Sequence, residues 1–204
     1  MPCRYFYTPL ATHSILTNIF VTSGYKILLK MARITPLSSE TAPSIVLAEF
    51  ERHCIRFKTR ITNMKGILGY SLTAFEVYMQ WYVVYDDMRI ILGQRLVNLY
   101  AYSISRASQC LLWTTYFRKC IIDAGENPDK LKLTERDRLV MEFGKAIGSN
   151  HGKTDQALFD KLSRLFNARK MVDIISFAGQ MIAACIFANA TETDLDFYLE
   201  GYEP

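Results

Sequence analysis

Apolar residues recur every three or four positions along most of the chain, a spacing typical of amphipathic α-helices. Two stripes of this kind follow each other in the first half: Leu72, Phe75, Met79, Tyr82 and Val83, then Val97, Tyr100, Ile104 and Ala107. Between the two stripes, Asp86 and Asp87 predict an exposed turn. No segment alternates apolar and polar residues as a half-buried strand would. The pattern therefore predicts an all-α protein.

Residues that start and stop helices divide the second half. Gly125 predicts a helix end in the left-handed conformation, and Pro128 prevents the helix from resuming. Thr134 has the hydroxyl that caps a new helix, and the acidic residues that follow suit its first turn. The pair Thr154–Asp155 predicts the start of a further helix. Proline is absent between these breaks, which favours long uninterrupted helices.

The most apolar long stretch of the chain, residues 171–190, predicts a last core helix. Its longest clean apolar run is Met181–Ala188, far short of the roughly 20 residues that span a membrane. Two apolar stripes lie side by side on this helix, so it is expected at the centre of the fold or at a subunit interface. The sequence therefore predicts a protein that does not associate with a membrane.

Composition and charge narrow the classes of partner. The chain has 204 residues, of which 50% are hydrophobic and 22% charged, with a net charge of +4. Three of the positive charges (Arg4, Lys26 and Lys30) lie in residues 1–30, which contain no acid, so the remainder is almost neutral and gives no sign of nucleic-acid binding. Met31 opens a compositionally different sequence. We expect residues 1–30 to be an N-terminal extension of doubtful status, with a possible true start at Met31, and residues 31–204 to be one domain.

The five cysteines are scattered and include no Cys-x-x-Cys pair, which argues against a disulfide framework and favours a reducing, cytoplasmic location. Cys110 and Cys120 are ten residues apart. That spacing separates them by about 15 Å along a helix, too far for a disulfide. Whether Cys54 or Cys185 approaches Cys110 in space is left open by the sequence, and a buried Cys185 on an apolar stripe is the expectation for simple core packing.

Two neighbouring segments, Ser105–Cys120 and Leu131–Phe143, resemble the carboxymuconolactone decarboxylase superfamily, which includes the alkylhydroperoxidase D-like (AhpD-like) proteins. Three further segments fit the same pattern: Met31–Ser38, Thr62–Ser71 and Asp173–Ala184. The resemblance implies an AhpD-like helical bundle of about seven helices. It also implies a homo-oligomer, either a trimer or a multiple of trimers.

Redox members of this superfamily carry a Cys-x-x-Cys at a helix N-terminus, with a histidine and a glutamate to move protons. The helix N-terminus lowers the pKa of the first thiol, and the second thiol resolves the oxidised intermediate. By resemblance, Cys110 takes the first cysteine position. The second cysteine falls on Trp113, the histidine on Phe117 and the glutamate on Asn98. The chain is therefore expected to be a divergent member whose redox site is degenerate, with Cys110 the remaining reactive candidate.

Two functions follow as hypotheses. The first is a peroxidase-related, antioxidant-type protein without dithiol peroxidase activity. The second is a non-catalytic, oligomeric binding or scaffold protein that takes a small apolar or aromatic ligand in an aromatic pocket. A small apolar molecule or a peroxide is the expected ligand. The aromatic set behind the second hypothesis could equally be core packing: Trp81, Tyr82, Tyr85, Trp113 and Tyr116. A decarboxylase is disfavoured because no general base is placed for it.

No metal or cofactor is expected, because no His, Cys, Asp and Glu spacing matches a metal site. The three histidines, His13, His53 and His151, are each predicted to be solvated surface residues. Basic residues near Cys110 (Arg106, Arg118 and Lys119) could attract an anionic substrate, but an exposed helix face explains them as well.

Overall fold

The computed structural model describes residues 32–204, and this part of the chain is helical without any strand. Its elements are α1 (Ser44–Phe57), α2 (Asn63–Leu68), α3 (Leu72–Met79), α4 (Trp81–Leu92), α5 (Gln94–Ala107), α6 (Leu111–Asp123), α7 (Glu135–Ser149), α8 (Gln156–Leu165), α9 (Ala168–Thr191) and the 3-10 turn η1 (Phe197–Leu199). The all-α prediction is confirmed. The helices outnumber the expected seven partly because only Gln80 separates α3 from α4. The predicted extension and the expected start at Met31 lie outside the described residues.

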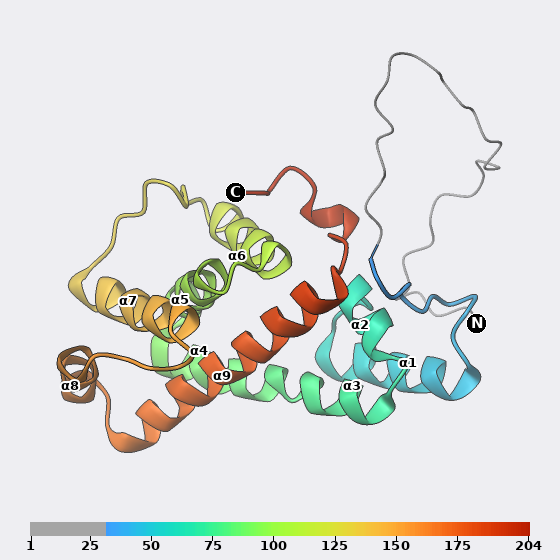
Figure 1. Ribbon diagram of the computed structural model, residues 1–204, viewed down its shortest axis with the longest axis horizontal. Helices are drawn as coiled ribbons and strands as arrows, with labels where there is room; N and C mark the ends of the chain where they lie inside the picture. Colours follow the sequence, from blue (N-terminus) through green and yellow to red (C-terminus); the bar gives the residue numbers. More distant parts are fainter. Residues whose placement is uncertain (1–31) are drawn as a thin grey trace, which may run out of the picture.

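The helices form two groups that α9 joins (Figure 1). Helices α1 to α3 lie on one side and α5 to α8 on the other, while α9 runs across both. The chain after α9 turns back and places η1 against α6. The centre of the second group is filled by large side chains that are at most 1% exposed, among them Tyr100, Phe117, Phe143 and Phe177.

The helix boundaries predicted in the second half are confirmed. Gly125 follows α6 with φ at +81°, the left-handed conformation expected of it. Thr134 caps α7, and the carboxylate of Asp137 accepts in return from the Thr134 backbone N–H at 3.0 Å. Asp155 caps α8 through the N–H of Ala157 at 2.7 Å.

The predicted turn at Asp86 and Asp87 is wrong. Both residues lie within α4, where their exposed carboxylates face solvent. The turn between the two apolar stripes lies instead at Gly93, which separates α4 from α5 with φ at +84°. Paired acids are compatible with the outer face of a helix, whereas a positive φ favours glycine, so the glycine was the stronger signal.

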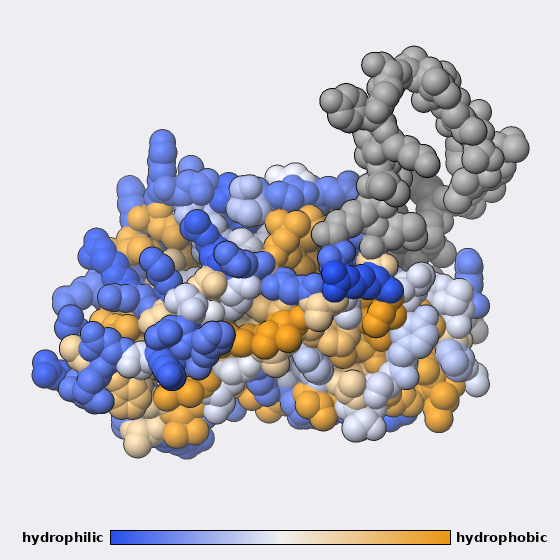
Figure 2. Space-filling model, in the orientation of Figure 1, coloured by the Kyte–Doolittle hydropathy of each residue, from blue (hydrophilic) through white to orange (hydrophobic). Residues whose placement is uncertain are grey.

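The last helix, α9, runs where the apolar stretch predicted it. Its inner stripe, which includes Ile174, Phe177 and Met181, is completely buried. Its outer stripe is exposed at Val172, Ile175 and Ile186 by 61%, 41% and 63%, and Figure 2 shows apolar surface on the face that α9 crosses. Within residues 32–204, α9 is the helix long and apolar enough to cross a membrane by length and composition. Self-association and the absence of membrane contact stay predictions.

A substitution at Gly144 can test how closely α5 and α7 pack against each other. A Cβ at this position would lie 2.4 Å from the Ser103 Oγ and 2.8 Å from the Tyr100 ring. We therefore expect Gly144→Ala to lower the free energy of unfolding by about 1–3 kcal/mol. Gly179→Ala on α9 is the matched control, because nothing lies within 4 Å of its Cβ position; it should raise stability by about 0.5–1 kcal/mol. Urea denaturation measures both, and equal effects would contradict the close approach.

Candidate functional site

Cys110 lies at the N-terminus of α6, as its sequence position implied. It is the residue before the helix, in an extended conformation, and is only 1% exposed. The backbone N–H groups of Leu112 and Trp113 lie in the first turn of the helix, next to its sulfur. Unpaired N–H groups at a helix start favour a thiolate, so they help to lower the pKa of Cys110 below its ordinary value.

The second sulfur near Cys110 comes from α9. Cys185 belongs to the same buried cluster as Cys110, and interaction with its thiol is the largest cause of the lowered Cys110 pKa. The same interaction, together with burial, raises the pKa of Cys185. Cys185 is completely buried. The sequence left open whether Cys185 approaches Cys110, and the structure places both thiols, from separate helices, in one buried cluster.

The other three positions of the family pattern hold no proton-transfer group. Trp113 is partly buried, and its Nε1–H has no partner among the described residues. Phe117 is completely buried, with its ring 5.0 Å from that of Tyr116. Asn98 accepts from the Tyr85 hydroxyl at 2.8 Å. In residues 32–204 no group of His, Cys, Asp and Glu side chains could hold a metal ion.

A cavity of about 1250 Å³ opens beside this region. Its walls come from α1 and the loop to α2, from the junction of α3 and α4, from α6 and α9, and from the segment around η1. Its aromatic lining consists of Tyr78, Trp81, Tyr82, Trp113, Tyr116, Phe197 and Tyr198. Of the five aromatic residues singled out in the sequence, only Tyr85 is not part of the lining. The sequence left open whether these residues line a pocket or pack in the core. The structure places the other four in the wall of the cavity.

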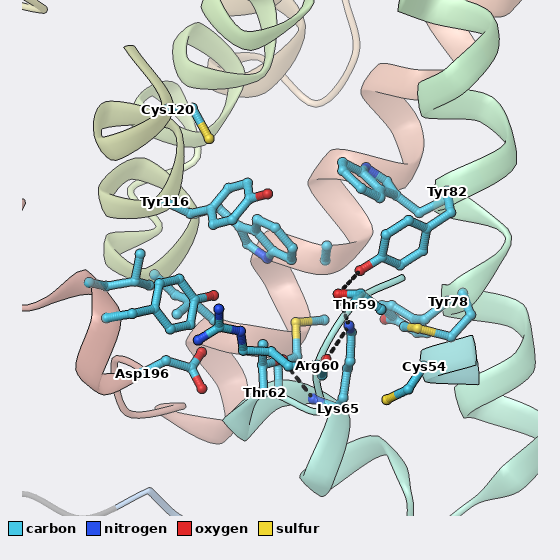
Figure 3. Close-up of a pocket in the computed structure, with 18 of the residues that line it drawn as sticks. Cys54, Thr59, Arg60, Thr62, Lys65, Tyr78, Tyr82, Tyr116, Cys120 and Asp196 are labelled. Carbon is cyan, nitrogen blue, oxygen red and sulfur yellow. Dashed lines mark hydrogen bonds between the residues drawn. The ribbon is translucent and has the colours of Figure 1, made fainter. Parts of the chain in front are cut away.

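Lys65 lines this cavity and extends toward Thr59 and Tyr82 (Figure 3). Its side chain is 6% exposed, and its ammonium donates to the Arg60 carbonyl oxygen at 2.7 Å and the Thr59 hydroxyl at 3.1 Å. The same ammonium lies 5.2 Å from the centre of the Tyr82 ring. No carboxylate in the described residues forms an ion pair with it.

Asp196 faces the same cavity from the C-terminal segment. Its carboxylate accepts from the backbone N–H of Asn63 at 2.9 Å. Burial raises the pKa of Asp196 to about 6, although the N–H of Asn63 and the charges of Lys65 and Arg60 oppose the shift. A carboxylate in a cavity that titrates near neutral pH is suited to proton transfer. Neither Lys65 nor Asp196 stood out in the sequence, because 131 residues separate them.

The charged and thiol groups on α6 are held in local contacts. Lys119 forms an ion pair with Asp123 one turn along the helix. Arg118 makes two hydrogen bonds to Asp129, at 3.0 and 2.9 Å. Burial raises the pKa of the Cys120 thiol to about 11, so this thiol is protonated at neutral pH.

The prediction that His53 is a solvated surface residue is wrong. Its side chain is 3% exposed and its ring lies 5.1 Å from that of Phe57 and 5.2 Å from that of Phe75. Burial, then the charge of Lys65, lowers the pKa of His53 to about 3. The neighbouring Arg52 and Arg56 are exposed on the outer face of α1 and gave the misleading basic pattern.

Comparison with known proteins supports the fold. No protein-family model matches the sequence, and no curated protein sequence matches it significantly. Among solved structures, the apo form of the debrominase Bmp8 superposes with a TM-score of 0.64 and 14% identity, over 83% of this chain and 95% of the other. An uncharacterized peroxidase-related protein from Silicibacter sp. TM1040 gives 0.60 and 17%, over 85% and 93%. The chain therefore shares the all-helical fold of these two proteins.

The raised pKa of Asp196 predicts that the stability of the protein depends on pH. Because its folded pKa of about 6 lies above the ordinary value of 3.8, the folded state binds more protons between these pH values, and stability falls as pH rises through them. Asp196→Asn keeps an oxygen that can accept from Asn63 but removes the charge. We expect it to raise the free energy of unfolding by about 1–3 kcal/mol at pH 8, with no gain at pH 4. Thermal melts at both pH values measure this, and a loss of stability at pH 8 would contradict it.

Proposed function

We propose that this protein is a peroxidase-related member of the carboxymuconolactone decarboxylase and AhpD-like superfamily that binds a small aromatic molecule and does not use Cys-x-x-Cys chemistry. Two findings support the assignment: the fold shared with a peroxidase-related protein, and the resemblance of the segments around Cys110. Neither supplies a ligand, so the proposal rests on the cavity.

The observation that carries the proposal is the aromatic lining of the cavity. Ligand sites are commonly preformed clefts with apolar and aromatic walls and a few polar groups. Here both tryptophans of the chain, Trp81 and Trp113, belong to the wall, together with four tyrosines. At about 1250 Å³ the cavity exceeds what one small aromatic molecule needs, leaving room for substituents or water.

Two unpartnered polar atoms would orient such a molecule. The Trp113 Nε1–H and the Gln180 Oε1 are buried without a hydrogen-bond partner in the described part of the chain, and both residues line the cavity. A buried polar atom without a partner costs about 1–3 kcal/mol. A ligand that accepts from the indole and donates to the amide would relieve that cost.

Trp113 thus occupies the position of the resolving thiol and lines the proposed binding cavity. The remaining thiol, Cys110, is almost fully buried and lacks the proton-relay residues of the family. Rapid turnover needs an exposed thiolate and a proton donor for the leaving hydroxide. These features support a protein without dithiol peroxidase activity, as the sequence predicted.

Binding can be tested through the protein's own fluorescence, because its two tryptophans both line the cavity. The neutral probe N-phenyl-1-naphthylamine absorbs in the range of tryptophan emission. We expect it to quench that emission saturably, with a Kd of about 1–100 μM, within the ordinary range for small ligands. Ala183→Phe should weaken binding by filling the wall, because Ala183 is an exposed lining residue of α9.

Ala190→Phe is the matched control, since Ala190 is exposed on the same helix but does not line the cavity. It should leave the Kd unchanged. Unsaturable quenching, or equal Kd values for wild type and Ala183→Phe, would contradict the proposed binding function.

A second candidate function, thiol oxidation, is favoured by the contact between Cys110 and Cys185. Oxidation would join the two sulfurs. Each thiol loses one proton and one electron. One hydrogen peroxide molecule takes up these two protons and two electrons and becomes two water molecules. The contact supplies the second sulfur that the sequence lacks beside Cys110, but burial of both thiols limits access of the oxidant.

We expect hydrogen peroxide to convert this pair slowly to a disulfide, seen in the intact mass as the loss of two hydrogen atoms. Cys110→Ser and Cys185→Ser should each abolish that mass change. Cys120→Ser should retain it, because Cys120 lines the cavity and is not one of the two thiols that react. With a dithiol donor, hydroperoxide reduction should stay at the uncatalysed rate. An unchanged mass would make the pair simple core packing, whereas turnover abolished by Cys110→Ser would make the protein a dithiol peroxidase.

A further inference from the structure

The charges in the cavity indicate more about the ligand than its aromatic walls do. We propose that the ligand is a planar aromatic anion whose charged group binds between Lys65 and Arg60 while its rings lie against the aromatic walls. The inference rests on the proposed binding function and narrows it to one class of ligand.

The ammonium of Lys65 is the first argument for an anion. Lysine is almost never fully buried unless paired, yet Lys65 is 6% exposed and forms no ion pair with a described carboxylate. Its two hydrogen bonds, to Thr59 and to the Arg60 carbonyl, are to neutral oxygens. An ammonium has three donors, so one N–H remains for an acceptor in the cavity.

The balance of charges around the cavity is the second argument. Four cations line it (Lys58, Arg60, Lys65 and Lys119), against the two carboxylates Asp123 and Asp196. The pairing of Lys119 with Asp123 removes one charge of each sign, which leaves three cations and Asp196. Because apolar walls exclude water, charges in such a site interact more strongly than on an open surface. The electrostatic potential in the cavity therefore favours a bound anion.

The arrangement of the rings supports a planar body for that anion. Figure 3 shows Tyr82 and Tyr116 on opposite sides of the cavity, with Lys65 below Tyr82. The Tyr82 ring is held in place, stacked on Phe57 at 4.7 Å and bonded through its hydroxyl to Thr59 at 3.3 Å. Arg60 places its guanidinium 4.8 Å from the Tyr198 ring centre, on the same side as Asp196. Phe57 and the Lys65 ammonium already lie against the Tyr82 ring. A ring system against the opposite wall, at Tyr116, would carry an acidic substituent toward Lys65 and Arg60.

The test compares two probes that share one aromatic body. 1-Anilinonaphthalene-8-sulfonate is N-phenyl-1-naphthylamine with an added sulfonate, which stays ionised across the working pH range. We expect the sulfonate probe to bind at least tenfold tighter at pH 7.5, measured through its own fluorescence and through quenching of Trp81 and Trp113. At higher salt that advantage should shrink, because ions screen the attraction.

Variants locate the anion subsite. Arg60→Gln, at an exposed position, should weaken the sulfonate probe about tenfold and leave the neutral probe unchanged, and Lys65→Met should do the same. Arg138→Gln is the matched control, since Arg138 is exposed on α7 and does not line the cavity. It removes the same charge and should change neither Kd.

The outcomes separate this inference from the binding function. If the neutral probe binds as tightly as the sulfonate, or if Arg138→Gln acts like Arg60→Gln, the anion proposal is overturned while the binding function stands. If neither probe binds to the wild-type protein, both fail. Should Lys65→Met not fold, Arg60→Gln decides the question alone.

Discussion

The packing of α9 across both groups of helices is the constraint on which the rest of the structure depends. Its inner stripe contributes Phe177 and Met181 to the core of the second group, and Ala184 and Cys185 to the core around α1. Hydrogen bonds to α9 reinforce this position, from the Tyr100 hydroxyl to the Ile174 carbonyl at 3.2 Å and from the Trp81 indole to the Met181 sulfur at 3.2 Å. The cavity and the thiol pair both lie where α9 passes α6.

That geometry explains how one chain can hold two sulfurs in contact without a Cys-x-x-Cys. In a Cys-x-x-Cys at the start of one helix, the helix geometry fixes the distance between the two thiols. Here the register between α6 and α9 fixes it instead, so the thiol contact depends on tertiary packing. On α6, the ring of Trp113 lies 6.1 Å from that of Phe117 and joins the cavity wall.

The sequence predicted what local chemistry determines. Helical periodicity, the left-handed Gly125 and the Thr134 cap each involve residues within one or two turns, and each was confirmed. One error was local, because the turn lies at Gly93 and not at Asp86 and Asp87. The other errors occurred where tertiary contacts decide. His53 lies in a basic stretch of sequence, but α3 and α4 cover it with aromatic rings. Cys110 and Cys185 are 75 residues apart, and no local pattern measures the distance between such residues in space.

The presence of Lys65 and Asp196 in one cavity follows from the same tertiary effect and has a chemical consequence. Asp196 titrates near pH 6 because burial outweighs the attraction of Lys65 and Arg60. An anion bound between those cations would weaken their effect on the carboxylate and raise its pKa further, because like charges disfavour ionisation. Ligand binding and proton uptake by Asp196 would then favour each other, as linkage requires. An aromatic anion bound in this cavity would therefore have a protonated carboxyl beside it, which is a group able to transfer a proton.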